Sequence, residues 1–158
     1  HSFLHSMTVG ENISLALQKL TKLSGDEIKE RVFNSLEEVD MVNTEDLMPS
    51  ELSGGMKKRV GIARAIAIKP GYLFYDEPTT GLDPVMTDSI NRLILKFQNT
   101  GEVTSVIITH EMRTVYDVSD RVLLLHEGKI RFDGSPEEIK NVDDLVVQQF
   151  ITGNSTLV

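Results

Sequence analysis

The stretch at residues 51–83 constrains the fold of this chain more than any other. It contains a Ser-Gly-Gly turn at 53–55, then a run rich in alanine and isoleucine, then a short apolar segment that ends in Asp76 and Glu77. A glycine turn before periodic apolar residues is typical of a helix start, and the Pro-Gly pair that follows the run is typical of a helix end. We therefore expect a helix over 56–69, then a strand, then two adjacent carboxylates at the carboxyl end of that strand.

Apolar segments and turn residues after this stretch favour an α/β fold. The run at 72–75 reads as a strand with apolar residues throughout, the pattern expected when both faces of a sheet are covered. Further strands are predicted at 103–109 and 121–125, and residues 126–129 are typical of a hairpin turn. Helical patterns alternate with these strands, so we expect an α/β sheet that is preceded by a helical insertion.

Two helices are expected in the first 50 residues. One follows Thr8, and the next begins at a capping box that runs from Ser24 to Glu27. Pro84 suits the first turn of a later helix, and residues 135–138 form another capping box. The apolar residues of the second helix recur at three- and four-residue spacing and are expected to form one buried face: Ile28, Val32, Phe33, Leu36 and Val39.

Composition excludes several classes of protein. A chain of 158 residues is long enough for one domain with a core, and its formal net charge of -8 gives no basic surface for nucleic acid. There is no cysteine, which excludes disulfides and thiolate metal sites. Apolar runs are strand-sized and fall short of the roughly 20 residues that cross a bilayer.

The Ser-Gly-Gly turn has the chemistry of an anion site. Gly54 and Gly55 let a ligand approach the backbone closely, and a helix that starts here directs unpaired N–H groups outward. Ser53 adds a hydroxyl donor, so a phosphate would be held well. A glycine-rich helix cap with no ligand explains the same three residues.

The carboxylate pair and a histidine suggest metal and water chemistry. Asp76 could hold Mg2+, and Glu77 could orient or deprotonate an attacking water. His110 follows the next predicted strand and could donate a hydrogen bond to a terminal phosphate. Solvated strand-end charges and a surface histidine are the alternatives when each feature is taken alone. All these motifs occur together in one order, which favours a shared nucleotide site over the chance occurrence of each motif.

Together the motifs resemble the ATP-binding subunit of an ABC transporter. Residues 52–56 (Leu-Ser-Gly-Gly-Met) look like its signature motif, and residues 73–76 look like Walker B. Glu77 falls at the catalytic glutamate, residues 80–83 match the D-loop, and His110 matches the switch histidine. The resemblance implies part of a P-loop NTPase domain, with a mostly parallel sheet that is flanked by helices.

The resemblance also implies ligands and partners. They are ATP and Mg2+, with two ATP molecules held between the subunits of a head-to-tail homodimer. The signature residues would contact the nucleotide of the partner subunit, and Asp83 would connect the two sites across the dimer. The contacting residues would be Ser53, Gly54, Gly55 and Met56.

Within its own subunit, each remaining motif residue has an implied role. Asp76 would hold Mg2+ through water, Glu77 would polarise the attacking water, and His110 would contact the γ-phosphate. Hydrolysis would then reopen the dimer and drive an integral membrane permease.

Three details suggest a subfamily. Met56 stands where most members carry glutamine, and residues 77–84 and 146–153 are similar to the Mla/Mce-type ATPases that energise phospholipid movement between membranes. This similarity implies a lipid cargo and an Mce-type lipid-binding component as a further partner, and the acidic net charge predicts no nucleic-acid partner. It also implies a peripheral position on the cytoplasmic face of the inner (plasma) membrane.

The chain departs from the family at its N-terminus. It has no Gly-x-x-x-x-Gly-Lys-[Ser/Thr] motif, so the loop that cradles the β- and γ-phosphates is absent from these residues. We therefore expect a fragment that is inactive alone, with a helical subdomain at 1–50 and a catalytic subdomain at 51–158. A soluble ABC ATPase not tied to transport, and a non-catalytic relative, remain open alternatives.

Overall fold

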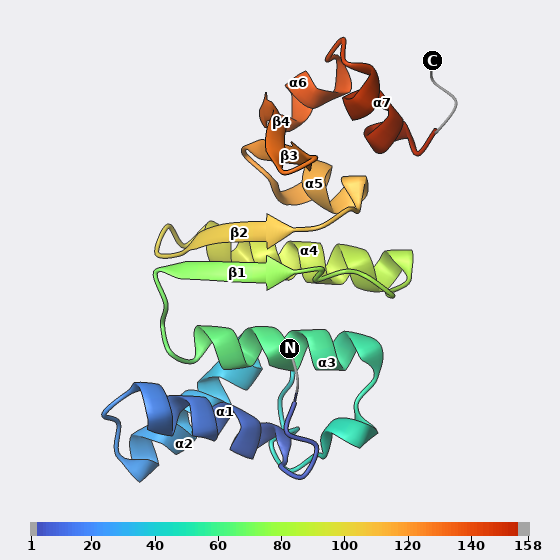
Figure 1. Ribbon diagram of the computed structural model, residues 1–158. Helices are drawn as coiled ribbons and strands as arrows, with labels where there is room; N and C mark the ends of the chain where they lie inside the picture. The colour runs from blue at the N-terminus through green and yellow to red at the C-terminus, as the bar shows by residue number, and fades with distance from the viewer. Residues whose placement is uncertain (1–2, 155–158) are drawn as a thin grey trace. The chain divides into compact units, whose positions relative to one another are not determined.

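The computed structural model describes residues 3–154 (Figure 1). They fall into two compact units that divide after Ile108. We call the described residues up to Ile108 the N-terminal unit and those from Thr109 onward the C-terminal unit. Both units combine helices with strands, which agrees with the predicted α/β class. In the described part of the chain, no helix is long and apolar enough to cross a membrane.

The first two helices of the N-terminal unit begin where their caps predict. Helix α1 spans Val9–Leu20 and α2 spans Gly25–Glu38, and each has a complete capping box, at Thr8 and at Ser24. The predicted apolar face of α2 is buried except for Phe33, which is 47% exposed. That part of the prediction is wrong because Phe33 follows the buried Val32 by one residue, a rotation of about 100° around the helix.

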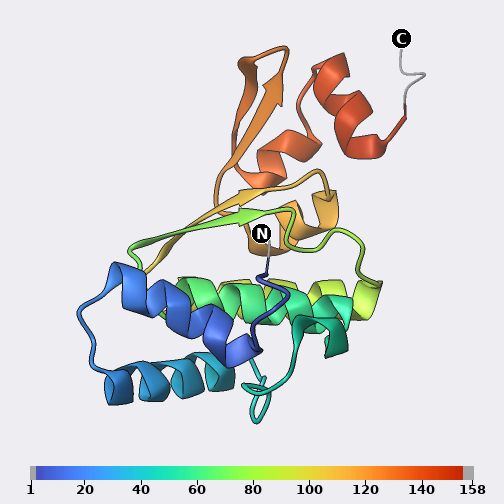
Figure 2. The same cartoon turned by 60° about the horizontal axis from the view of Figure 1, so that its bottom comes forward.

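Two long helices and two strands complete the N-terminal unit. Strands β1 (Tyr72–Asp76) and β2 (Thr104–Ile108) pair in parallel, with Tyr72 opposite Thr104 and Asp76 opposite Ile108. Figure 2 shows helices α3 and α4 on the same side of this sheet. The 3-10 turn Pro49–Glu51 precedes α3, which spans Gly54–Ile66, and α4 spans Pro84–Gln98.

The two faces of strand β1 differ in burial. Leu73 and Tyr75 are buried, whereas Tyr72 and Phe74 are each 68% exposed. The expectation that both faces are covered is therefore wrong for this chain. Its helices α3 and α4 pack on one face only, and the apolar side chains of the other face keep their exposure.

The C-terminal unit is built on an antiparallel hairpin. Strands β3 (Val122–His126) and β4 (Lys129–Gly134) are joined by Glu127 and Gly128, which have φ values of 49° and 74°. Positive φ at both central residues is the geometry of a two-residue hairpin turn, and the hairpin was predicted. A small core of Leu124, Ile139 and Val147 joins the hairpin to helices α6 and α7. The helices of this unit are α5 (Met112–Val118), α6 (Pro136–Lys140) and α7 (Leu145–Thr152).

Candidate functional site

The start of helix α3 combines a cap with an opening for a ligand. Ser53 is the N-cap, and its Oγ accepts a hydrogen bond from the Met56 N–H at 3.3 Å. As an acceptor in this bond, the hydroxyl keeps its proton for donation to an anion. The cap interpretation and the phosphate interpretation of Ser53 are therefore compatible.

Glycine suits the two positions of the signature, Gly54 and Gly55, for different physical reasons. A Cβ added at Gly55 would lie 2.1 Å from the Cε of Met86, so close packing against α4 favours a glycine there, and any larger residue must displace the methionine end. A Cβ at Gly54 would lie 3.7 Å from Leu82, which is an ordinary contact, and Gly54 is exposed. Packing thus explains Gly55, while Gly54 is where the backbone is open to an approaching ligand.

The carboxylate of Asp76 lies at the carboxyl end of β1. The residue is exposed and pairs with Ile108 in the sheet. Among the described residues, no group of three or more His, Cys, Asp or Glu side chains could hold a metal ion by itself. One carboxylate still suits Mg2+, because that ion keeps several waters and takes other oxygens from substrate phosphates. Asp76 therefore fits Mg2+ as a single protein ligand.

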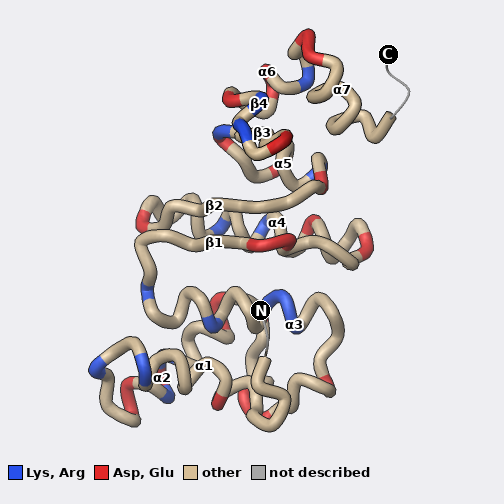
Figure 3. The backbone as a smooth tube through the Cα atoms, in the orientation of Figure 1, with Lys and Arg blue, Asp and Glu red and all other residues tan. Residues whose placement is uncertain are grey.

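Hydrogen bonds hold both the backbone and the side chain of Glu77. Its N–H donates to the Ile108 carbonyl at 2.8 Å, and its own carbonyl accepts from Lys58 Nζ at 2.5 Å. Its Oε2 accepts a hydrogen bond from the Thr80 hydroxyl at 2.7 Å. Figure 3 shows the basic residues near the start of α3 and the acidic segment that ends β1. The sequence predicts that Lys58 lies on this helix, but it does not indicate that Lys58, rather than a neighbouring basic residue, contacts Glu77.

Asp83 is the N-cap of helix α4. Its Oδ1 accepts hydrogen bonds from the backbone N–H groups of Val85 and Met86 at 2.9 and 3.0 Å. Because Gly54 lies near Leu82 and Gly55 near Met86, the start of α3 lies beside this loop. The fold thus brings the predicted signature and D-loop together within the N-terminal unit.

Arg59 is a second basic residue whose role was missed. Its guanidinium donates to the Val39 carbonyl at 2.5 Å, to Asp40 Oδ2 at 2.9 Å and to Ser89 Oγ at 2.6 Å. These bonds join α3 to the end of α2 and to α4. In the sequence, Arg59 follows two lysines, and nothing in this basic run indicates that Arg59 links three helices. We call this set of hydrogen bonds the Arg59 clamp.

His110 lies in the C-terminal unit, two residues after the end of β2. It is exposed, and its sequence position follows the carboxyl end of a strand as predicted. Its contact with a γ-phosphate stays a prediction.

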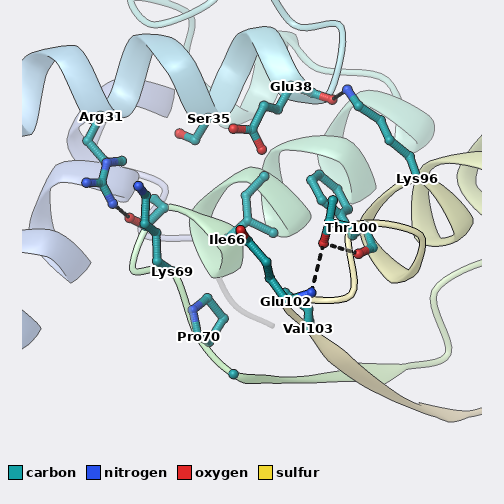
Figure 4. A pocket seen from close by; sticks show the side chains of 13 residues that line it. Arg31, Ser35, Glu38, Ile66, Lys69, Pro70, Lys96, Thr100, Glu102 and Val103 are labelled. Atoms are coloured by element: carbon teal, nitrogen blue, oxygen red, sulfur yellow. Dashed lines mark hydrogen bonds between the residues drawn. The ribbon is translucent and has the colours of Figure 1, made fainter.

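A cavity of the N-terminal unit lies away from these residues. The cavity has a volume of about 340 Å3 (Figure 4). Its lining includes Gly71, the residue before β1, and Val103, the residue before β2. Arg31 and Lys96 at its rim donate to the carbonyls of Ala67 and Glu38. The cavity is therefore at the amino ends of the strands, whereas Glu77 follows the carboxyl end of β1.

Comparison with known proteins decides the family. Residues 1–80, about half of the chain, match the family described as "ABC transporter". The chain belongs to the ABC transporter family. The part of the prediction that named this family is confirmed.

Curated relatives of this ABC transporter chain match it over nearly its full length. The protein TRIGALACTOSYLDIACYLGLYCEROL 3, chloroplastic, of Arabidopsis thaliana is 38% identical over 165 residues, which cover 94% of this chain and 48% of that protein. The methionine import ATP-binding protein MetN 1 of Bacillus cereus is 41% identical over 151 residues, covering 95% of this chain and 43% of that protein. The chain thus spans about half the length of the curated relatives it matches.

Solved ABC structures support the fold. The cbiO1 protein of Clostridium perfringens, part of the ABC transporter complex cbiONQ, has a TM-score of 0.77 and 32% identity, and the match covers 90% of this chain and 57% of that one. The ATP-binding cassette MJ0796, a dimer bound to ADP and Pi in a post-hydrolysis state, has a TM-score of 0.74 and 28% identity. That match covers 85% of this chain and 59% of MJ0796. The predicted fold class, part of an ABC ATPase domain, is confirmed.

Proposed function

We propose that this chain is part of the ATP-binding and ATP-hydrolysing subunit of an ABC transporter. The observation that carries the proposal is the pair Asp76 and Glu77 at the carboxyl end of β1, with Glu77 tied to helix α3 through Lys58. Ligands of parallel α/β sheets bind off the carboxyl ends of the strands, which is where these carboxylates lie. Mg2+ would neutralise charge on the phosphates of bound ATP.

Asp76, Glu77 and His110 each have a proposed role in the subunit's own site. Asp76 would hold Mg2+ through water, because its exposed carboxylate supplies hard oxygens and Mg2+ keeps several of its own waters. Glu77 orients and polarises the attacking water, and its carboxylate is already directed by the Thr80 hydroxyl. His110 contacts the γ-phosphate. The domain division at residue 50, with a helical subdomain before it, is part of the same proposal.

The signature end of α3 serves the ATP that is bound by a partner subunit. Ser53, Gly54, Gly55 and Met56 present a capped helix start, with the open backbone at Gly54. Asp83 links the two sites from the loop beside them. A dimer in which each subunit lends its signature to the other makes the oligomer part of the site, and MJ0796 is itself a dimer with ADP and Pi. Each chain would then supply parts of two sites.

The cargo is proposed to be a phospholipid or another lipid. The similarity of residues 77–84 and 146–153 to Mla/Mce-type ATPases supports this, and one relative is named for a galactolipid. Another relative is named for methionine import. The proposed partners are a permease and an Mce-type component, at the cytoplasmic face of the inner (plasma) membrane. A soluble ABC ATPase and a non-catalytic fragment are the alternatives.

Steady-state ATP hydrolysis by the full-length protein tests the catalytic assignment. Glu77→Gln removes the water-polarising carboxylate and is expected to abolish turnover while ATP still binds and dimers accumulate. Glu102→Gln, at an exposed position before β2, is a matched control that should turn over normally. Normal turnover in Glu77→Gln would overturn the role of Glu77.

Residues 1–158 alone are expected to bind ATP very weakly, because they contain no phosphate-binding loop motif. Tight ATP binding by these residues in calorimetry would contradict the proposal that they form only part of the ATP site.

A further inference from the structure

Glu77 has a backbone conformation that a glutamate rarely adopts. Its φ is 48°, in the left-handed region that favours glycine. The next residue is Pro78, and a residue before proline is pushed toward extended conformations, so the position is unfavourable twice over. Such a conformation persists only where surrounding contacts hold it.

The contact on the Glu77 carbonyl comes from a different element. Lys58 lies in the second turn of α3, and its Nζ donates to that carbonyl at 2.5 Å. Hydrogen bonds from other groups hold the N–H and the carboxylate of Glu77. The Lys58 ammonium thus holds the orientation of the Glu77–Pro78 peptide through a partly buried hydrogen bond from a charged donor.

We propose that Lys58 is a positioning residue that fixes Glu77 for hydrolysis, an inference that rests on the proposed role of Glu77. The ammonium holds the peptide plane after Glu77 and thereby aims the carboxylate that polarises water. Because Ser53 caps the same helix, a displacement of α3 by a nucleotide at its start is transmitted through Lys58 to Glu77. The link joins the two half-sites within one subunit.

Lys58→Met tests the link in the full-length protein by two independent measurements. At saturating ATP, kcat is expected to fall about tenfold with KM nearly unchanged, the scale of one charge-assisted hydrogen bond. In the nucleotide-free protein, hydrogen exchange at the Glu77 amide is expected to be about tenfold faster, because the segment is held less firmly. Lys58→Arg keeps a cationic donor and should recover most of both losses, which also guards against a variant that folds poorly.

Lys57→Met is the matched control. It removes an equal charge from the preceding residue of α3, which is also partly buried, and should match the wild type in both measurements. Unchanged kcat or unchanged exchange in Lys58→Met would overturn the proposal, and so would an equal loss in Lys57→Met. If the wild type hydrolyses no ATP, the proposed function fails instead, and the exchange rates still show whether Lys58 holds Glu77.

Discussion

Replacing Gly55 by alanine is expected to destabilise the N-terminal unit by about 1 kcal/mol. The new Cβ would lie 2.1 Å from the Cε of Met86, so the methionine must move. Overpacking costs about 1–3 kcal/mol, and the flexible end of the methionine places this clash in the lower part of that range, at about 1.5 kcal/mol. The helix propensity of alanine returns about 0.5 kcal/mol at a helix terminus, which leaves a net loss of about 1 kcal/mol.

A double-mutant cycle with Met86→Ala isolates the clash. The three nearest atoms to the new Cβ all belong to Met86, so their removal should make Gly55→Ala neutral or stabilising by about 0.5 kcal/mol. Urea unfolding of the four proteins, followed by far-ultraviolet circular dichroism, is expected to give a coupling of about 1–2 kcal/mol. Gly54→Ala, with an ordinary 3.7 Å contact, is the control that should not destabilise. A coupling below about 0.5 kcal/mol would refute the packing explanation of Gly55.

Two further predictions concern charged contacts. Arg59→Met removes the bonds to Val39, Asp40 and Ser89 from a side chain that is only 16% exposed. It should cost about 2–3 kcal/mol in urea unfolding, and a loss below about 0.5 kcal/mol would contradict the clamp. Arg121 donates to both carboxylate oxygens of Asp133, and this hydrogen bonding lowers the pKa of Asp133. The stability from this pair is present above the unfolded pKa and lost as pH falls through the folded one. Thermal unfolding should therefore show Asp133→Asn less stable than wild type at pH 7, with the gap closing below about pH 4; a constant gap would contradict the assignment.

Local features of this fold could be predicted because neighbouring residues decide them. The capping box at Ser24 needs only Glu27, and the hairpin turn needs only two residues that accept positive φ. Asp83 as a helix cap before Pro84 follows the same logic.

Features that depend on distant elements could not be predicted in this way. The choice between Lys57 and Lys58 depends on where β1 ends relative to α3, and the sequence carries no sign of that contact. The exposed face of β1 depends on which elements cover it, and its apolar residues alone could not show this. The packing of Gly55 depends on Met86, which lies on another helix.

Mixing two inactive subunits tests most directly whether this chain supplies parts of two different sites. Gly54→Glu places a carboxylate at the open start of α3, where the fold has room for it, and should repel the partner's nucleotide. Glu77→Gln disables the subunit's own site. Each full-length variant alone is expected to be inactive, whereas a mixed dimer holds both defects in one site and leaves the other intact. Recovery of ATP hydrolysis on mixing is the predicted result, and a mixture that stays inactive although its subunits exchange would contradict the account.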